Sequence, residues 1–596
     1  MTDVEVPVLI VGGGGAGLTA SMLLSGLGVD SLLVSALPTT SRLPKAHLLN
    51  QRSMEILDDA GVAQAIYDIG TPRHHMAKTA FYAGFAGYPD AGRLIARLDA
   101  WGAGGADLDW ESASPMCSAN LPQIRLEPLM KKHAEALAPS RVRFGHEVTE
   151  YSPDVNGVTV HVHEIAGETD YTVRARYVLA CDGGRFVGPQ LGVTMEGLRD
   201  VGQMVSMHMT ADLSMWSKDP DVLIRWTWLP HMGKMATLVP MGPTRWGPES
   251  EEWVFHLNYT NEDPRSLDDG QVEADMRRAL GIGDHPVDIH MITRWELMGV
   301  VASRLRVGRT FLLGDAAHRH PPTGGLGLTS ATQDVHNLCW KLKLVLDGKA
   351  GDALLDSYEP ERRSSVQWNV NNSLDSALNH IMTGEALGVT ASDLSPEEGW
   401  DIVRRLWSTD PADEEYRYGV RRAIARQSME FRKLNVEYGY RYVSDAIMSD
   451  GTPDTETADH VRIYEPSTRP GHPLPHAWVE GASGERVSTL HLVRPGRFLL
   501  IVGEDAQGWR EAGLRVANEG DIPLDVVVIG QVDGDYFDVQ STWQRYRGIT
   551  SHGCVLVRPD RFVTWRASAE STDAVAELVA VFEDVLAQPM TSSSTV

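Results

Sequence analysis

Six residues near the start of the chain have the spacing that a nucleotide phosphate requires. Residues 12–17 read Gly-Gly-Gly-Gly-Ala-Gly, which is the GxGxxG spacing, and they lie between a β-rich run at 8–11 and a helical pattern from Leu18. Such glycines let the backbone turn and approach a pyrophosphate, and the helix N-terminus beyond them carries positive partial charge. We therefore predict a dinucleotide site whose contacts are Gly12, Gly14, Gly15, Ala16 and Gly17.

Two further stretches follow buried-strand patterns. Residues 310–313 lead into Gly-Asp-Ala-Ala-His-Arg-His at 314–320 and a glycine-rich segment at 324–327, and Asp182 with Gly183 follow the strand pattern at 177–181. An acid such as Asp315 can accept hydrogen bonds from a sugar-alcohol chain, and a helix that opens at 324–327 offers free N–H groups to an anion. Two such helix N-termini predict one long ligand that contacts both of them.

Some features argue against other ligands. A simple NAD site would place Asp or Glu at the end of the strand at 31–34, where the chain carries Ser35. His318 and His320 resemble a metal pair, but a third ligand is not evident and the turn explains them, so we expect no metal. The net charge of −26 argues against nucleic acid and anionic membranes, and no segment has the flanks and length of a signal peptide or membrane span.

The composition is that of a globular protein with several domains. The chain has 596 residues, 42% of them hydrophobic and 22% charged, which excludes a disordered or fibrous protein. Its four cysteines form no CxxC pair, which fits a reducing compartment, so we expect a cytoplasmic protein without disulfides.

The hydrophobic patterns predict an α/β fold of several parts. A Rossmann-like domain is expected at 1–190 and 297–370, discontinuous because the strand pattern at 310–313 returns to it. Alternating runs predict an inserted antiparallel-sheet substrate domain at 191–296. A helical connecting region at 371–460, a small α/β domain at 461–590 and a disordered tail at 591–596 complete the chain.

These motifs together resemble the FAD-dependent aromatic hydroxylases of the p-hydroxybenzoate hydroxylase fold, closest to the phenol and dichlorophenol monooxygenases. The resemblance covers nearly the whole chain and includes Pro-Lys-Ala-His-Leu-Leu-Asn-Gln-Arg at 44–52, Asp-Ser-Tyr-Glu-Pro-Glu-Arg-Arg at 356–363, Glu-Tyr-Gly-Tyr-Arg-Tyr at 437–442 and Val-Arg-Pro-Asp at 557–560. It implies that the last domain is thioredoxin-like but lacks the redox cysteine pair. It also implies FAD as the cofactor, NADPH or NADH and O2 as co-substrates, and a homodimer or larger even assembly.

The resemblance further implies roles for individual residues. The glycine turn would hold the pyrophosphate, Gln123 would touch the flavin side, and Asp315 would bind the ribityl chain. Asp182 and Gly183 belong to a motif linked to both FAD and NAD(P)H. The flavin ring would be lined by Pro322, Gly325, Gly327 and Leu328. Two residues depart from the family pattern: Lys45 replaces the usual Arg, and Thr329 replaces a common Asn.

The family reaction requires a base. In the reaction that the resemblance implies, NAD(P)H reduces FAD, O2 adds to give a flavin C4a-hydroperoxide, and one oxygen is transferred to a phenolic ring, ortho to its hydroxyl. A phenol has a pKa of about 10, so a nearby imidazole would help it ionise near neutral pH. His47 is our candidate for this catalytic base; the alternative is that His47 only hydrogen-bonds the protein or FAD.

The substrate region is rich in Trp and Met. Most of these side chains should be ordinary core, and a minority should line a pocket that excludes water. We take Trp226, Met235 and Trp295 as the candidates for contact with a small aromatic substrate. The scarcity of pocket arginines favours a hydrophobic phenol or hydroxypyridine over a benzoate.

The leading hypothesis is therefore a single-component FAD monooxygenase, acting either in aromatic catabolism or in natural-product tailoring. Two alternatives stay open. One is a flavin-dependent halogenase or another flavin oxidoreductase, and the other is a flavin-binding protein without catalysis, which the departures at Ser35, Lys45 and Thr329 would suit.

Overall fold

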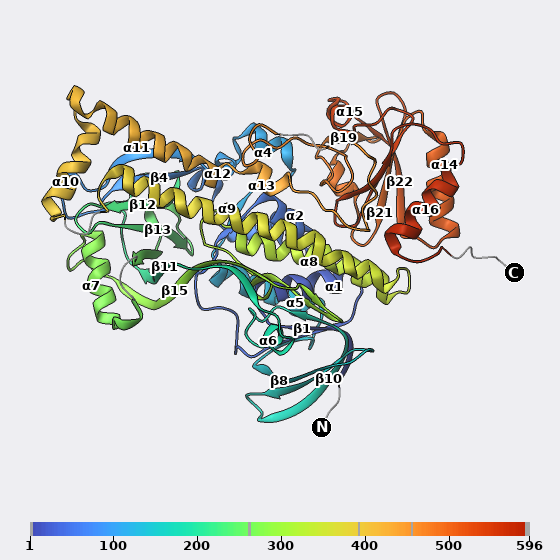
Figure 1. Ribbon diagram of the computed structural model, residues 1–596, viewed down its shortest axis with the longest axis horizontal. Helices are drawn as coiled ribbons and strands as arrows, with labels where there is room; N and C mark the ends of the chain where they lie inside the picture. The colour runs from blue at the N-terminus through green and yellow to red at the C-terminus, as the bar shows by residue number, and fades with distance from the viewer. Residues whose placement is uncertain (1–3, 260–263, 391–393, 454–456, 591–596) are drawn as a thin grey trace.

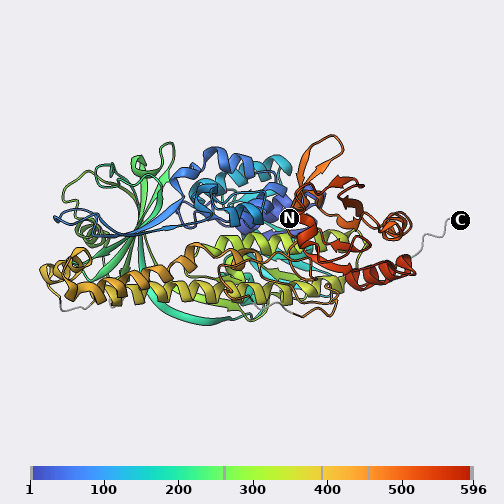
Figure 2. The ribbon, with the colours of Figure 1, turned by 90° about the horizontal axis from the view of Figure 1, so that it is seen from above.

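The computed structural model describes residues 4–259, 264–390, 394–453 and 457–590, and the tail expected at 591–596 lies outside these ranges. The described residues form a mixed α/β fold with three large sheets that follow one another along the long axis of the molecule (Figure 1). The first sheet occupies the middle, and the third lies at the C-terminal end. The second lies beside helices α7 (Asp269–Leu280), α10 (Pro396–Arg404) and α11 (Glu414–Arg426). Figure 2 shows a long layer of helices that lies along one side of both the first and the second sheet.

The first sheet is built around parallel strands in the order β7-β2-β1-β10-β17. Because these strands are parallel, their carboxyl ends lie at one edge of the sheet, which is where ligands bind in open α/β folds. Its strands are β1 (Val4–Val11), β2 (Ser31–Ser35), β7 (Val142–Phe144), β8 (His146–Pro153), β9 (Val158–Glu164), β10 (Thr169–Ala180), β16 (Arg306–Val307) and β17 (Thr310–Leu312).

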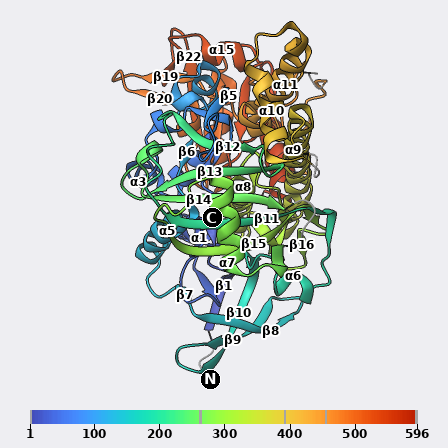
Figure 3. The same cartoon turned by 90° about the vertical axis from the view of Figure 1, so that its left-hand side faces the viewer.

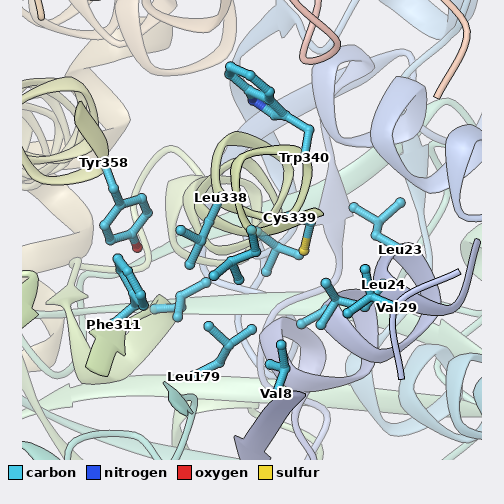
Figure 4. Close-up of a cluster of buried hydrophobic side chains, with 14 of the residues drawn as sticks. Val8, Leu23, Leu24, Val29, Leu179, Phe311, Leu338, Cys339, Trp340 and Tyr358 are labelled. Atoms are coloured by element: carbon cyan, nitrogen blue, oxygen red, sulfur yellow. The ribbon is translucent and has the colours of Figure 1, made fainter. Parts of the chain in front are cut away.

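Helices α1 (Gly15–Gly26), α5 (Gln123–Leu137) and α8 (Leu326–Leu346) pack on this sheet. Figure 4 shows side chains from β1, β10, β17, α1 and α8 in one buried cluster, with Cys339 of α8 on the side of Leu23 and Leu24 of α1, whereas the ring of Trp340 points away from them. Strands buried on both faces read as continuous apolar runs, which is why the sequence identified β1 and β10 so clearly. This core fixes α1 and α8 relative to the sheet edge.

The second sheet is mostly antiparallel, with the strand order β18-β15-β11-β14-β13-β12-β4-β5. Figure 3 views the molecule from the end where α7 lies, with β11 to β15 stacked above the strands of the first sheet. Its strands are β4 (Lys78–Ala83), β5 (Arg93–Asp99), β11 (Met195–Thr210), β12 (Val222–Leu229), β13 (Lys234–Gly242), β14 (Glu252–Tyr259), β15 (Asp288–Ala302) and β18 (His318–Arg319). Helix α7 (Asp269–Leu280) covers one face with the buried side chains of Val272 and Met276.

This sheet corrects the expected domain boundaries. Residues 78–83 and 93–99 were expected in the Rossmann-like domain at 1–190, but they form β4 and β5 at the edge of the second sheet, next to β12. Strand β15 also continues past 296, and β18 joins it from the segment after β17. Strand pairing between segments far apart in the chain leaves no local signal, so contiguous boundaries could not represent it.

A single long helix joins the regions. Helix α9 (Tyr358–Leu387) lies beside α8 at one end and beside α11 (Glu414–Arg426) at the other (Figure 1). It crosses the boundary that we expected between 370 and 371, because residues on both sides are helical and nothing in the sequence interrupts the helix there. The connecting region continues with α10 (Pro396–Arg404), α12 (Ser428–Phe431) and α13 (Leu434–Tyr438).

The third sheet has the central order β22-β21-β24-β25, in which β21 and β22 are parallel and β24 and β25 are antiparallel neighbours. Helices α14 (Gln507–Glu519) and α16 (Ala574–Leu586) pack against it. The strands are β19 (Trp478–Gly481), β20 (Arg486–Ser488), β21 (Phe498–Gly503), β22 (Leu524–Gly530), β23 (Tyr536–Phe537), β24 (Cys554–Val557) and β25 (Val563–Ala567).

Cys117, Cys181, Cys339 and Cys554 are all free thiols. Burial raises the pKa of the Cys554 thiol in β24, which makes it a poor nucleophile. Among the described residues, no helix is both long enough and apolar enough to cross a membrane.

A buried ionic cluster attaches the C-terminal sheet to the helices of the first region. The guanidinium of Arg558 forms two parallel bonds to Glu361 of α9, at 2.6 and 2.9 Å, and also binds Asp560. Lys341 of α8 donates to the same Glu361 carboxylate at 2.7 Å. Arg558 and Lys341 hold the pKa of Glu361 well below its usual range even though burial opposes this. Such a pair is costly to break, because the remaining charge stays buried.

We therefore predict that Arg558→Met destabilises the protein by about 3 to 5 kcal/mol, since it leaves Glu361 with one cation fewer in a buried site. Urea unfolding followed by far-UV circular dichroism measures the change. Arg404→Met is the matched control, because Arg404 pairs with Asp401 at the exposed surface of α10, where an ion pair contributes about 1 kcal/mol or less. Equal effects of the two substitutions would contradict the prediction.

Candidate active site

The glycine turn after β1 closes tightly on itself. Gly12 has φ +113°, and a methyl group on it would lie 2.2 Å from the carbonyl oxygen of Cys181, at the end of the neighbouring strand β10. A methyl group on Gly17 would lie 1.9 Å from the carbonyl oxygen of Gly12. Both positions therefore need glycine for the fold itself. At Gly14, in contrast, the nearest atom to such a methyl group is a carboxylate oxygen of Glu127 at 3.6 Å.

The N-termini of α1 and α8 face the same crevice. A methyl group on Gly15 would lie 2.6 Å from a side-chain carbon of Leu328, and one on Gly314 would lie 3.2 Å from Cβ of Ala16. Within the described part of the chain, no side chain caps α1 or α8, so their first N–H groups stay available to a ligand. The structure thus brings together the two glycine-rich segments that the sequence singled out.

The acidic candidates differ in what they do. Both oxygens of Asp182 accept bonds from the loop that follows, from the backbone N–H groups of Gly184, Phe186 and Val187 at 2.8 to 3.0 Å. Asp182 therefore shapes its own turn. Asp315 follows β17 at the same sheet edge, and its side chain is exposed and can reach a ligand.

The remaining cofactor candidates lie on the other side of this crevice. Gln123 begins α5, and its side-chain amide donates to Glu127 at 2.5 Å. Lys45 is exposed, with φ +23°. Thr329, the second departure from the family pattern, is buried and donates its hydroxyl to the carbonyl of Leu326 at 2.9 Å, so it serves its own helix.

The crevice fits FAD in its shape and its donor groups. The open backbone at Gly14 faces the N-terminus of α1, which suits a pyrophosphate. At the other end, a methyl group on Gly327 would have only His320 as a neighbour, at 4.0 Å, so the backbone at the start of α8 can lie close to a flat ring. A dinucleotide can therefore extend from α1 past Asp315 to α8.

A cavity of about 310 Å³ opens beside the segment 322–325. One wall is a face of the second sheet, a second wall comes from α9 and α12, and His47 with Leu48 forms a third. The lining includes Trp226, Met235 and Trp295, our three candidates for substrate contact, together with Trp101, Ile224, Trp228, Thr237, Val239, His256, Asn258, Leu297, Pro322, Gly325, His380, Ile381, Glu430 and Phe431.

Alternation along the strands divides the aromatic residues between the two faces of the second sheet. Successive strand residues point to opposite faces, so in β14 His256 and Asn258 face the cavity while Trp253 and Phe255 pack under α7. The same alternation places Trp226 and Trp228 of β12 on the cavity side. Trp226, Trp228, Met235 and Trp295 therefore line the cavity, whereas Met232, Met241, Trp246, Trp253 and Phe255 are not among its lining residues.

Hydrogen bonds fix the orientation of His47. The side chain of Asn120 donates its amide N–H to Thr71 at 2.7 Å, so its carbonyl oxygen, 2.5 Å from Nδ1 of His47, is an acceptor. Nδ1 of His47 then carries the proton and Nε2 carries the lone pair. Burial lowers the pKa of His47 below 6.5, with a smaller opposing effect from Asn120, so the imidazole is neutral at pH 7 and can accept a proton.

A second histidine has the opposite arrangement. The indole N–H of Trp295 donates to the hydroxyl of Ser206 at 2.7 Å, and we assign the proton of that hydroxyl to Nδ1 of His256, which lies 2.7 Å from the same oxygen. Burial, and secondarily the charge of nearby His47, lowers the pKa of His256 to about 4. His256 is therefore neutral, and its Nε2 carries the proton. The cavity contains one imidazole that accepts and one that donates.

Our sequence analysis missed His256, His380 and Glu430. His256 had a usable signal, because it alternates with Trp253 and Phe255 along a strand whose other face is apolar. His380 and Glu430 had none, since they come from two helices whose pairing depends on the tertiary fold.

The fold and the cavity define a dinucleotide-binding α/β enzyme with a buried site for an apolar substrate. Comparisons with known proteins agree: residues 5–373 match the family model of the FAD binding domain, and residues 467–589 match that of the aromatic-ring hydroxylase C-terminal region. The 2,4-dichlorophenol 6-monooxygenase of Delftia acidovorans is 35% identical, over 98% of this chain and 99% of that protein. The chain belongs to the family of FAD-dependent aromatic-ring hydroxylases.

Two further comparisons support this assignment. Phenol 2-monooxygenase of Pseudomonas sp. (strain EST1001) is 33% identical, over 96% of this chain and 91% of that protein. The crystal structure of the flavin-dependent monooxygenase PieE in complex with FAD and substrate aligns with a TM-score of 0.90 at 37% identity, over 99% of this chain and 100% of that one. The protein is thus an FAD-dependent aromatic monooxygenase.

The geometry at the glycine turn predicts that folding and cofactor binding can be separated. Gly14→Ala should leave the fold intact, because the nearest atom to the new methyl group lies 3.6 Å away, but should weaken FAD binding at least about tenfold, because the methyl group blocks the approach of the pyrophosphate. Gly17→Ala should instead disturb the turn, with 1.9 Å to the Gly12 oxygen. The flavin absorbance of the purified protein and its circular dichroism report the two effects. Full flavin content in Gly14→Ala would contradict the assignment.

Proposed function

We propose that this enzyme hydroxylates a hydrophobic phenol or hydroxypyridine ortho to its hydroxyl, with NADPH or NADH and O2 as co-substrates and no partner protein. The observation that carries the proposal is the cavity beside residues 322–325, which is lined by aromatic side chains and contains an imidazole, that of His47, with its lone pair available. Two relatives are named as 2- and 6-monooxygenases of phenols, and both positions are ortho to the hydroxyl. The setting is either aromatic catabolism or natural-product tailoring.

The proposed cofactor contacts follow from the crevice. Gly12, Gly14, Gly15, Ala16 and Gly17 would hold the pyrophosphate, and Asp315 would bind the ribityl chain. Gln123, Lys45, Asp182 and Gly183 would lie along the flavin, with the last two also near the nicotinamide co-substrate. The flavin ring would lie against Pro322, Gly325, Gly327 and Leu328. Bound FAD supplies the reduction by NAD(P)H and the activation of O2 that side chains cannot provide.

The histidines of the cavity prepare the substrate. A phenol has a pKa of about 10, so its ring becomes strongly electron-rich only when the hydroxyl loses its proton. Nε2 of His47 accepts that proton, and Nε2–H of His256 donates to the phenolate oxygen that forms. Both roles follow from the hydrogen bonds that fix the two rings.

The apolar wall protects the reaction from water. Trp226, Met235 and Trp295 present mostly carbon to the cavity, and the indole N–H groups of Trp226 and Trp295 are already bonded to Thr79 and Ser206. This apolar part of the wall offers few partners to water, which would otherwise divert activated oxygen to hydrogen peroxide.

We further propose that the C-terminal region, about 461–590, is a thioredoxin-like domain without redox function. Its β21-α14-β22 unit, followed by the antiparallel pair β24 and β25 and helix α16, supports this, as does the single buried Cys554. The enzyme would act in the cytoplasm as a homodimer or larger even assembly; the free thiols favour a reducing compartment.

The function predicts oxidation of the nicotinamide co-substrate that depends on an aromatic compound. The purified yellow protein in air should consume NADPH or NADH slowly alone and much faster with a hydrophobic phenol or hydroxypyridine, because the cavity admits such rings and little else. Absorbance at the nicotinamide band measures consumption, and mass spectrometry of the product should show one added oxygen. No acceleration by any member of a panel of such compounds would refute the proposed reaction.

His47→Ala should slow hydroxylation about 10²- to 10⁴-fold at pH 7 without loss of FAD, because the substrate must then ionise in the absence of a base. The lowered pKa of His47 means that the wild-type rate is constant above about pH 6.5 and falls only at lower pH, where the imidazole is protonated. The variant should instead gain about tenfold per pH unit up to the substrate pKa near 10. Product formation from pH 6 to 9 distinguishes the two profiles, with His163→Ala on the exposed strand β9 as control. A pH-independent rate in His47→Ala would exclude this role.

A further inference from the structure

A third oriented imidazole lies in the cavity, on α9. Nε2 of His380 lies 2.7 Å from a carboxylate oxygen of Glu430, at the end of α12, and both side chains are buried. The other oxygen of Glu430 accepts the backbone N–H of Gly324 at 3.0 Å. The pair thus connects the cavity wall to the segment against which we place the flavin ring.

Glu430 determines which nitrogen of His380 carries the proton. An ionised carboxylate only accepts hydrogen bonds, so Nε2 of His380 is the donor, and in the neutral imidazole Nδ1 carries the lone pair. Among the described residues, Nδ1 of His380 has no hydrogen-bond partner and almost no contact with solvent. His380 is one of the residues that line the cavity, and we place the missing donor on a ligand there, which must approach Nδ1 closely.

The ring of His380 is held in place. It stacks on the indole of Trp226, with ring centroids 4.1 Å apart and planes inclined by 28°, and the ring centroid of Phe81 lies 6.2 Å from those of both Trp226 and His380. Lys433 donates to the carbonyl oxygen of Gly324, so the segment at 430–433 holds Gly324 through both its N–H and its carbonyl. A ring fixed on three sides presents its lone pair in a defined direction, which is what a recognition site needs.

We propose that Nδ1 of His380 accepts a hydrogen bond from a second hydroxyl group of the substrate, at a different place from the phenolic hydroxyl that His47 and His256 bind. The inference rests on the proposed function. His380 comes from α9, whereas His47 comes from the segment before β3 (Leu48–Leu49) and His256 from β14, so these rings enter the cavity from three separate elements. A cavity of about 310 Å³ admits an aromatic ring with a polar substituent.

The substrate class is then a hydrophobic phenol with a hydrogen-bond donor on the part of the molecule remote from the reacting hydroxyl. A substrate with a carbonyl or ether oxygen at this place would meet a lone pair and bind no better than a hydrocarbon. A plain alkylphenol would leave Nδ1 without a partner, which is costly for a buried acceptor. The cost of leaving Nδ1 of His380 unpaired makes the cavity select substrates that carry a hydrogen-bond donor at this position.

Three nearly isosteric probes test the proposal: 4-isopropylphenol, 4-(1-hydroxyethyl)phenol and 4-acetylphenol, with the same three substituents also placed on 2-naphthol to vary the reach. Binding to the FAD-loaded enzyme is measured without NAD(P)H from changes in the flavin spectrum and from tryptophan fluorescence. One net hydrogen bond predicts that the alcohol binds about threefold to tenfold more tightly than the isopropyl compound in at least one series, and that the ketone does not.

Two variants then test the residues. His380→Phe keeps a ring for stacking on Trp226 but removes the lone pair, so the three probes should bind within about twofold of one another, and 4-isopropylphenol should bind at least as tightly as it does to the wild type, because no acceptor is left unpaired. Glu430→Gln can still accept from Gly324, but its amide donates to Nε2 of His380 and moves the ring proton to Nδ1. In this variant the ketone should gain affinity over the isopropyl compound, an effect that a purely structural role of the pair would not produce.

His163→Phe is the control, since His163 is bonded to Asp170 at the surface of β9. It should leave all the ratios unchanged. If the wild-type enzyme hydroxylates 4-isopropylphenol but shows no preference for either alcohol, or if His380→Phe keeps that preference, the proposal for His380 is overturned and the proposed function stands. If no phenol binds or is oxidised, the proposed function fails, and the role of His380 fails with it.

Discussion

One buried carboxylate, that of Asp334 in α8, positions the three parts of the active site relative to one another. It accepts the backbone N–H of Gly314 at 3.0 Å, Nε2 of His318 at 2.7 Å and Nε of Arg362 at 2.8 Å. These donors belong to the turn that carries Asp315, to edge strand β18 of the second sheet, and to α9. Interactions with His318 and Arg362 hold the pKa of Asp334 below its usual range although burial opposes this. Removal of any donor would leave a buried charge short of a partner, so the three segments stay together.

The cavity that results is mostly carbon, and each of its three histidines is oriented by a neighbour. Asn120 orients His47, Ser206 orients His256, and Glu430 orients His380. Each partner fixes one ring nitrogen, which determines whether the opposite nitrogen accepts or donates. An imidazole alone would be ambiguous, because its proton can sit on either nitrogen. The acid–base properties of this site therefore depend on these partners as much as on the histidines themselves.

The sequence predicted the parts that depend on local signals. The turn at 12–17 was identified because a tight turn, a close backbone approach and a helix start all restrict residue type within a few positions, and the structure places it between β1 and α1. The alternating runs predicted the antiparallel second sheet for the same reason. Strands β4 and β5, in contrast, were assigned to the wrong sheet, because their pairing with β12 brings together segments far apart in the chain. His380 and Glu430 were missed for this reason too, since their contact exists only after α9 and α12 pack.

Burial of His47 lowers its pKa and makes it a weaker base, yet the same burial makes the proposed proton transfer feasible. In water the transfer from a phenol of pKa about 10 to an imidazole of pKa about 6.5 is uphill by roughly 5 kcal/mol. Inside the cavity the products are a phenolate and an imidazolium in contact, and two unit charges 4 Å apart attract by about 4 kcal/mol at an effective dielectric constant near 20. A hydrogen bond from His256 to the phenolate oxygen adds about 1.5 to 3 kcal/mol, because it is made to a charged group. Before the cost of burying the ion pair is counted, these two attractions match the cost of the transfer in water. The proposed transfer therefore requires both histidines and the exclusion of water, which would screen their attraction.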